Sequence, residues 1–118
     1  MGKGINSRQK GKRGELEACH VLRKLWLVPT LIRAAQACGA YAADLICALP
    51  LFHFEVKRYK TIASTKFMEQ AVEDKNDGQI PVVVQREDHG EWLLVIRLED
   101  SETFARTLVE HLDQQRSL

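Results

Sequence analysis

The sequence predicts an α/β domain in which a central mixed β-sheet is flanked by helices. Two observations support this fold class: apolar residues recur at helical spacing near both ends of the chain, and several strand-like segments lie between them. The expected element order is α-β-β-β-α-β-β-α, an order typical of helices packed on one sheet. The chain has 118 residues, the size of a single domain. We expect residues 14–118 to form this domain and residues 1–13 to form a flexible basic arm.

The first half of the chain predicts one helix and three strands. A helix is expected from Arg13 to Trp26, because apolar residues recur on one face and Pro29 follows. A weak strand at 30–33 precedes a turn of small residues. Strands are expected at Ala43–Leu49 and Phe52–Tyr59. Little more than Pro50 and Leu51 separates them, and this spacing predicts an antiparallel hairpin.

The second half predicts two further helices and two further strands. A helix at Ser64–Asp74 ends at the turn-forming segment 76–78. Strands at Ile80–Gln85 and Trp92–Leu98 enclose a polar turn. A last helix is expected from Ser101, as its N-cap, to about His111.

Composition excludes several classes of protein. Hydrophobic residues make up 45% and charged residues 28%, which is typical of a globular protein rather than a disordered one. No apolar run approaches the ~20 residues that span a bilayer, and the start carries no signal-peptide pattern. Three cysteines without paired spacing do not form a disulfide framework. We therefore expect an intracellular, cytoplasmic protein.

The net charge of +1 conceals an uneven distribution. Residues 1–14 contain five basic residues and no acid, which leaves 12 basic against 16 acidic residues in the remainder. Such a segment is suited to a polyanionic partner, and it is equally consistent with a solubilising terminus.

The strand at Phe52–Tyr59 carries the residues of greatest chemical interest. Side chains alternate across a sheet, so Glu55 and Lys57 share one face with His53. Asp44 begins the preceding strand and can approach Glu55 across the hairpin. Two converging carboxylates favour Mg²⁺ or Mn²⁺, and the Val56 carbonyl can supply a further ligand.

A lysine beside such a metal site has a chemical role of its own. Lys57 can orient or deprotonate a water, or stabilise charge that develops in a transition state. Glu15 is a candidate third acid, because it lies about 40° from the centre of the apolar helix face, whereas Glu17 lies about 120° away.

Other interpretations of these residues remain open. A Glu-x-Lys pair on a strand is commonly a solvated ion pair, and an Asp at a strand start is commonly a turn residue. Cys19, Cys38 and Cys47 lack the spacing of a zinc site and are expected to be buried thiols, with Cys47 inside a strand. His53 is expected to be a satisfied histidine of the sheet, although it shares the face of Glu55.

Taken together, the pattern resembles the PD-(D/E)XK nuclease superfamily, and within it the Holliday junction resolvases of archaeal and phage type. The residues that carry the resemblance are the basic, glycine-containing segment 10–15, Ala43-Asp44, Glu55-Val56-Lys57 and Gln70-Ala71. The chain departs from the family pattern at Ala43, where the motif has proline. The segment before Asp44 also lacks the serine-rich loop of the archaeal resolvases.

The resemblance implies a restriction-endonuclease-like core and a site for each motif residue. The family's metal-binding acids correspond to Asp44 and Glu55, its lysine to Lys57 and its first-helix acid to Glu15. Gln70 corresponds to a glutamine that orders the site or reaches the DNA. In this family Mg²⁺-dependent attack of water on phosphorus leaves a 5′-phosphate.

The function expected on this basis is a metal-dependent endodeoxyribonuclease, specifically a homodimeric Holliday junction resolvase. The expected DNA contacts are Lys10, Lys12, Arg13, Arg33, Gln36, Arg58 and Lys60. Two cuts require two active sites, and surplus apolar residues at 26–28, 31 and 92–94 are consistent with a dimer. Two alternatives stay open: a nuclease of the same fold in phage DNA processing, repair or restriction, and a catalytically silent DNA-binding protein.

Overall fold

The structure, a computed structural model, describes residues 3–37 and 42–118, with side chains described from residue 11 onward. It contains a five-stranded mixed sheet with three α-helices, in the expected order α-β-β-β-α-β-β-α. The helices are α1 (Lys3–Leu25), α2 (Ser64–Asp74) and α3 (Ser101–Arg116), with short 3₁₀ helices η1 (Ala34–Gln36) and η2 (Leu98–Asp100). The strands are β1 (Ile32–Arg33), β2 (Leu45–Ile46), β3 (Phe52–Tyr59), β4 (Ile80–Glu87) and β5 (Leu93–Val95).

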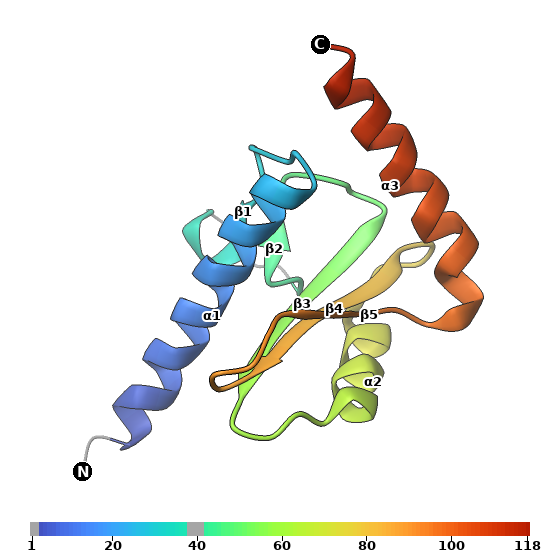
Figure 1. Ribbon diagram of the computed structural model, residues 1–118. Coiled ribbons are helices and arrows are strands. Elements are labelled where there is room, and N and C mark those ends of the chain that lie inside the picture. The colour runs from blue at the N-terminus through green and yellow to red at the C-terminus, as the bar shows by residue number, and fades with distance from the viewer. Residues whose placement is uncertain (1–2, 38–41) are drawn as a thin grey trace.

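The strands are arranged in chain order across the sheet, β1-β2-β3-β4-β5. The long central strands β3 and β4 are parallel, and the three other pairs are antiparallel. Helix α2 makes the crossover between β3 and β4, as a parallel connection requires. Figure 1 shows α1 and α2 on either side of these two strands.

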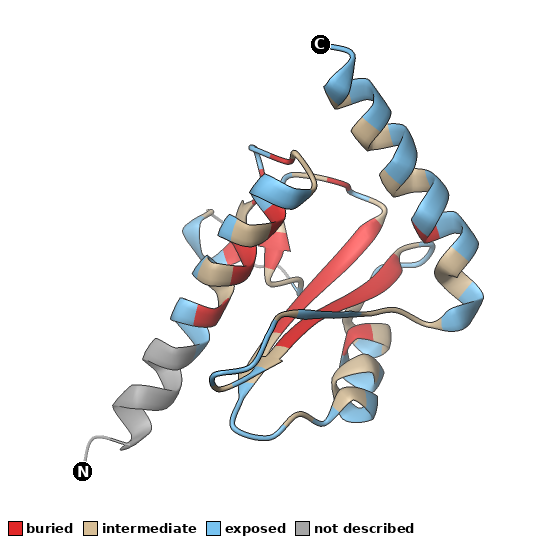
Figure 2. Ribbon diagram, viewed as in Figure 1, coloured by how far each residue is buried: buried red, intermediate tan, exposed pale blue. Residues whose placement is uncertain are grey.

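The hydrophobic core lies on the face of the sheet that α1 covers, and α3 contributes Phe104 to it. Phe52 stacks on Phe104 of α3, with ring centroids 4.8 Å apart. Trp26, at the end of α1, contacts both rings edge-on and also lies 6.2 Å from Phe54. Figure 2 shows that buried residues are concentrated in β3 and β4. Aromatic burial of this kind contributes much of the stability of a small domain.

Helix α1 approaches β3 closely at a glycine. Gly14 is buried, and a Cβ added there would lie only 3.1 Å from the Cβ of Arg58. Because glycine has no side chain, α1 can approach β3 closely at this position. The next residue, Glu15, is thereby brought near the strand that carries Glu55.

Several element boundaries differ from those expected. The sequence places the start of the first helix at Arg13, whereas α1 begins at Lys3 and includes most of the segment expected to be an arm. Extending a packed helix requires little free energy per residue, and Lys, Arg and Gln are good helix formers. At the other end of the chain, α3 continues five residues beyond His111. Ser101 is its first helical residue rather than its N-cap, and its hydroxyl donates to the Leu98 carbonyl.

The hairpin between β2 and β3 is also looser than predicted. Strand β2 ends at Ile46, because the backbone is left-handed at Cys47 (φ 76°) and at Leu49 (φ 50°). The connection therefore spans residues 47–51, and the expected strand Ala43–Leu49 shortens to two residues. Strand β5 is likewise reduced to Leu93–Val95. The antiparallel pairing of β2 with β3 is confirmed.

Two of the cysteines lie in different environments. Cys19 is buried, as expected, and its thiol donates to the Leu31 carbonyl. Cys47 is exposed in the connection after β2, so the expectation of a buried thiol in a strand is wrong there. Cys38 lies outside the described residues.

Among the helices that the structure describes, none is long and apolar enough to cross a membrane.

Candidate active site

Asp44 is held against β3 by two hydrogen bonds. Its backbone N–H donates to the Phe54 carbonyl at 2.8 Å, and its Oδ2 accepts from the Val56 N–H at 2.8 Å. Leu45, the next residue, is in register with Phe54. The carboxylate of Asp44 is thereby fixed beside the strand segment that carries Glu55, as the hairpin argument predicted.

Glu55 is more deeply buried than the sequence indicated. Its side chain and that of His53 are each only 2% exposed. Because α2 covers this face, the two residues form a buried pair, with His53 Nε2 2.9 Å from Glu55 Oε1. The other oxygen, Oε2, lies 3.9 Å from Lys57 Nζ. His53 is therefore a satisfied residue of the sheet, and its partner is the candidate metal-binding acid.

Lys57 lies near the open end of the same face, where α2 supplies its partners. Its ammonium donates a hydrogen bond to Gln70 Oε1 at 2.9 Å. It also lies 5.7 Å from the centroid of the Phe67 ring, within the range of a cation–π interaction. The ring of Phe67 stacks on Tyr59 at 5.2 Å. These contacts orient the lysine beside Glu55.

The electrostatics of the site are most evident at Asp44. Burial, the largest cause, and the negative charges of Glu55 and Glu15 together raise the pKa of its carboxyl to about 7. The Val56 N–H and the Lys57 ammonium oppose this rise in pKa. The three acids and the lysine therefore belong to one electrostatic group, and its excess of negative charge favours a bound proton or cation.

Glu15 and Glu17 have different partners. Glu15 accepts a hydrogen bond from Arg33 Nε at 3.0 Å, an ion pair that lies largely inside the protein. Glu17 lies 3.2 Å from Arg58 Nη1 and 3.4 Å from Arg86 Nη1. Glu15 therefore contributes to the electrostatic environment of Asp44. Glu17 instead joins α1 to arginines near the C-terminal ends of β3 and β4.

The expected DNA contacts divide into free and paired side chains. Lys12, Arg13, Gln36 and Lys60 are exposed, and the side chain of Lys10 lies outside the described residues. Arg33 and Arg58 are engaged in ion pairs, the latter also with Asp88 at 3.7 Å. Intramolecular pairing reduces their availability for phosphate, a difference that the sequence did not reveal.

Two features of the site are not evident from the sequence. The apolar pattern of residues 64–74 places Phe67 on the packing face of its helix, yet it lies beside the site lysine. It precedes Gln70 by three residues, a spacing that places both on one helix face and could have indicated the contact. Arg33 is expected to contact DNA, although its observed role is to hold Glu15.

Asp44 and Glu55 are the side chains best suited to bind a cation. Their carboxylate oxygens are hard ligands, and the charged form of Asp44 is disfavoured first by burial and then by its acidic neighbours. Within the described ranges, no group of three or more histidine, cysteine, aspartate or glutamate side chains is placed to hold a metal ion. Glu15, the third acid, is already paired with Arg33.

The chain was compared with protein-family models, with curated proteins and with solved structures. None of the three comparisons found a match. What the site can do therefore follows from its own residues.

Proposed function

We propose that this protein is an Mg²⁺-dependent endodeoxyribonuclease with a restriction-endonuclease-like core, and that its substrate is the Holliday junction. The observation that carries the proposal is the electrostatic group of Asp44, Glu55 and Lys57. Asp44 has a pKa raised to about 7 beside Glu55, and the ammonium of Lys57 lies 3.9 Å from Glu55. Two carboxylates can hold a divalent cation, and an adjacent lysine can stabilise the charge that develops on a phosphodiester during metal-assisted hydrolysis. The resemblance of the motif indicates the branched substrate.

Mg²⁺ fits the donor set of this site. Asp44 and Glu55 provide carboxylate oxygens, and the Val56 carbonyl and Glu15 are further candidate ligands from neighbouring positions. Burial is the largest cause of the raised Asp44 pKa, and the repulsion from Glu55 and Glu15 that adds to it is relieved when a cation binds. When bound, Mg²⁺ supplies a positive charge that polarises a phosphoryl oxygen and lowers the pKa of a bound water.

The chain's own residues supply the remaining functions. Lys57 is a hydrogen-bond donor that can hold the attacking water and stabilise charge developing on the phosphate. Gln70 accepts a hydrogen bond from this ammonium and limits its orientations. His53 restrains the carboxylate of Glu55 from within the protein. The lysine is thus positioned from α2, and the acid from the interior of the sheet.

The positive side chains near the site define a route for DNA. Lys12 and Arg13 lie on α1 within one turn of Glu15, and Lys60 follows the end of β3. All three side chains are exposed. Contacts from such residues to phosphates position the duplex without reading its sequence.

A cleavage assay tests the proposal. Labelled four-way junction, linear duplex and single-stranded DNA are each incubated with the protein, with Mg²⁺ or with EDTA. We expect Mg²⁺-dependent cuts in the junction that leave 5′-phosphates. Glu55→Gln and Lys57→Ala should lose about 10²–10³-fold in rate, while the exposed control Lys66→Ala should retain activity.

Each alternative outcome has a distinct meaning. Equal cutting of linear duplex would overturn the junction preference and leave the nuclease. Binding without cleavage under every metal condition would support a silent DNA-binding protein. Wild-type rates for folded Glu55→Gln and Lys57→Ala would show that the active site lies elsewhere.

A further inference from the structure

Strand β5 is an outer edge of the sheet and is apolar. It pairs on one side with β4, through Val84 opposite Leu94 and Val83 opposite Val95. Leu93 and Leu94 remain 45% and 44% exposed. An edge strand presents backbone N–H and C=O groups that can pair with another strand. An apolar edge of this kind is a candidate interaction surface.

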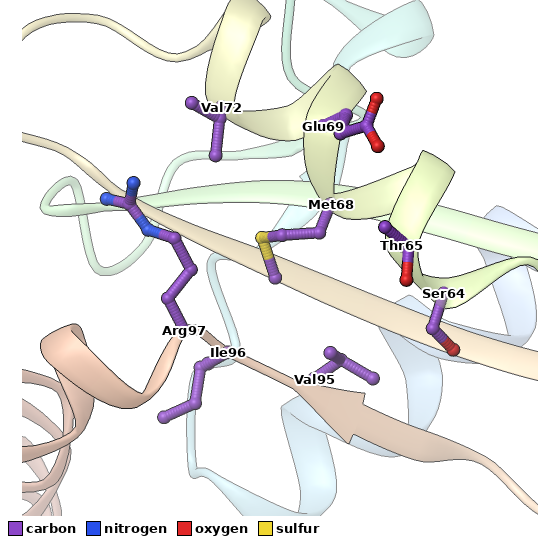
Figure 3. Close-up of a pocket in the computed structure, with 8 residues that line it drawn as sticks. All are labelled: Ser64, Thr65, Met68, Glu69, Val72, Val95, Ile96 and Arg97. Carbon is purple, nitrogen blue, oxygen red and sulfur yellow. The ribbon is translucent and has the colours of Figure 1, made fainter.

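Apolar grooves flank this edge on both faces of the sheet. Between β5 and α2 lies a groove of about 510 Å³, into which Met68 projects from α2 opposite Val95 and Ile96 (Figure 3). A smaller groove of about 110 Å³ lies toward α1 and is lined by Leu25, Trp26, Leu94 and neighbouring residues. A strand added at this edge would have apolar side chains to contact above and below.

The segment around β5 is longer than the part of it that pairs with β4. The sequence predicts a strand over Trp92–Leu98, but only Leu93–Val95 pairs with β4. The backbone is still extended at Arg97, with φ −75° and ψ 141°. A second partner at the open edge would complete the ladder.

We propose that β5 pairs antiparallel with β5 of a second copy of this chain, with Leu94 at the two-fold axis. The segment is self-complementary in this register: Leu94 faces the partner's Leu94, Leu93 the partner's Val95, Trp92 the partner's Ile96, and Glu91 the partner's Arg97. Every pair is apolar except the outermost one. That one joins opposite charges, and symmetry makes it occur twice.

The charges select this register over the alternatives. In a parallel pairing Glu91 would lie opposite the partner's Glu91, and like charges in such positions are destabilising. Moving the axis half a residue toward the C-terminus would place Trp92 opposite the partner's Arg97, and moving it toward the N-terminus would place Glu91 opposite the partner's Ile96. Arg97 already contacts Asp100 Oδ2 through Nε at 2.9 Å, but a guanidinium has five N–H donors and can bind a second carboxylate.

The pairing creates one continuous sheet of two copies. A two-fold axis perpendicular to the sheet keeps α1 of both copies on one face and α2 of both on the other. The pairing also provides the second active site that two cuts in one junction require. Only this consequence rests on the proposed function.

Analytical ultracentrifugation of the metal-free protein without DNA tests the pairing. We expect a reversible monomer–dimer equilibrium within about 1–100 µM. Leu94→Asp places two carboxylates at the axis and should raise the dimer Kd by at least about tenfold. The matched control is Val109→Asp, an exposed apolar position on α3, which should leave the Kd unchanged.

Charge reversal tests the register and does not depend on Leu94. Glu91→Arg and Arg97→Glu should each raise the dimer Kd several-fold, and the double variant should restore it to within about threefold of wild type. Circular dichroism melting confirms that each variant is folded.

The pairing would be overturned by a wild-type protein that stays monomeric throughout the range. A dimer Kd that Leu94→Asp leaves unchanged would also overturn it. So would a double charge-reversal variant whose dimer Kd is no closer to wild type than those of the single variants. A monomer that still cleaves DNA would overturn the pairing and leave the proposed function standing. A dimer that does not cleave DNA would leave the pairing standing and overturn the proposed function.

Discussion

The ammonium of Lys57 donates a hydrogen bond to the amide oxygen of Gln70 across 2.9 Å, joining the end of β3 to helix α2. The same ammonium lies 3.9 Å from Glu55 and over the Phe67 ring. A flexible lysine side chain loses rotamer freedom when it is ordered, and these contacts offset that cost within the folded protein. The orientation of the lysine is thus a property of the fold before any substrate arrives.

Gln70→Ala should therefore reduce DNA cleavage without abolishing it. The variant removes the hydrogen-bond partner of Lys57 but leaves the ammonium and both acids, so we expect a loss of about 10-fold in kcat, in the range of outer-shell substitutions. Single-turnover cleavage of a four-way junction measures the rate. Glu69→Ala, at the neighbouring exposed position on α2, is the control. A Gln70→Ala rate equal to that of the control would contradict a positioning role.

The stability of the metal-free protein should fall as the pH rises between about 4 and 7. The pKa of Asp44 is raised from 3.8 to about 7, chiefly by burial, so in this range the folded protein holds a proton that the unfolded chain releases. The stabilisation is complete below the unfolded pKa and is lost as the pH rises through the folded pKa. Thermal melting across this range measures the slope.

Asp44→Asn should flatten that pH dependence and stabilise the metal-free fold near pH 8. Asparagine resembles the protonated carboxyl, and its oxygen can still accept from the Val56 N–H. The same variant should bind Mg²⁺ more weakly, as titration calorimetry would show. Asp113→Asn, at an exposed position on α3, is the control. An unchanged pH slope in Asp44→Asn would show that another group controls this titration.

Glu15→Gln should slow cleavage more than Glu17→Gln. Glu15 contributes to the electrostatic environment of Asp44, whereas Glu17 pairs with Arg58 and Arg86. We expect a decrease of about 10-fold for Glu15→Gln and a near wild-type rate for Glu17→Gln. Both substitutions remove one charge from the same helix, so each is the other's control. Equal effects would remove the distinction between the two acids and leave the rest of the site unchanged.

The basic residues at the start of the chain should affect DNA affinity and leave the chemistry unchanged. Replacing Lys10, Lys12 and Arg13 with Ala should weaken binding and reduce the salt slope by up to about 0.9 for each phosphate that these side chains neutralise. Fluorescence anisotropy over a series of salt concentrations measures both quantities. Replacing Lys24, Arg106 and Arg116 with Ala changes the net charge equally and serves as the control. An unchanged slope would assign the first three residues to solubility alone.

The sequence by itself determined the order of elements and the bounds of the two elements that carry the lysine and its glutamine. Strand β3 and helix α2 have the predicted residues at both ends, Phe52–Tyr59 and Ser64–Asp74. Alternation along β3 correctly placed Glu55 and Lys57 on one face. Helix periodicity predicted different environments for Glu15 and Glu17, but it did not predict that Glu17 also contacts the sheet, through Arg58 and Arg86. These are local regularities of period 2 and 3.6, which a single segment contains in full.

The tertiary structure alone decided which charges are paired, buried or free. The pairing of Arg33 with Glu15 joins residues 18 positions apart, and that of Arg86 with Glu17 joins residues 69 positions apart. The burial of the pair His53 and Glu55 depends on α2 covering a face that alternation alone would have left open. The pKa of a carboxyl and the availability of an arginine depend on neighbours that are distant in sequence, because desolvation and charge pairing act through space rather than along the chain.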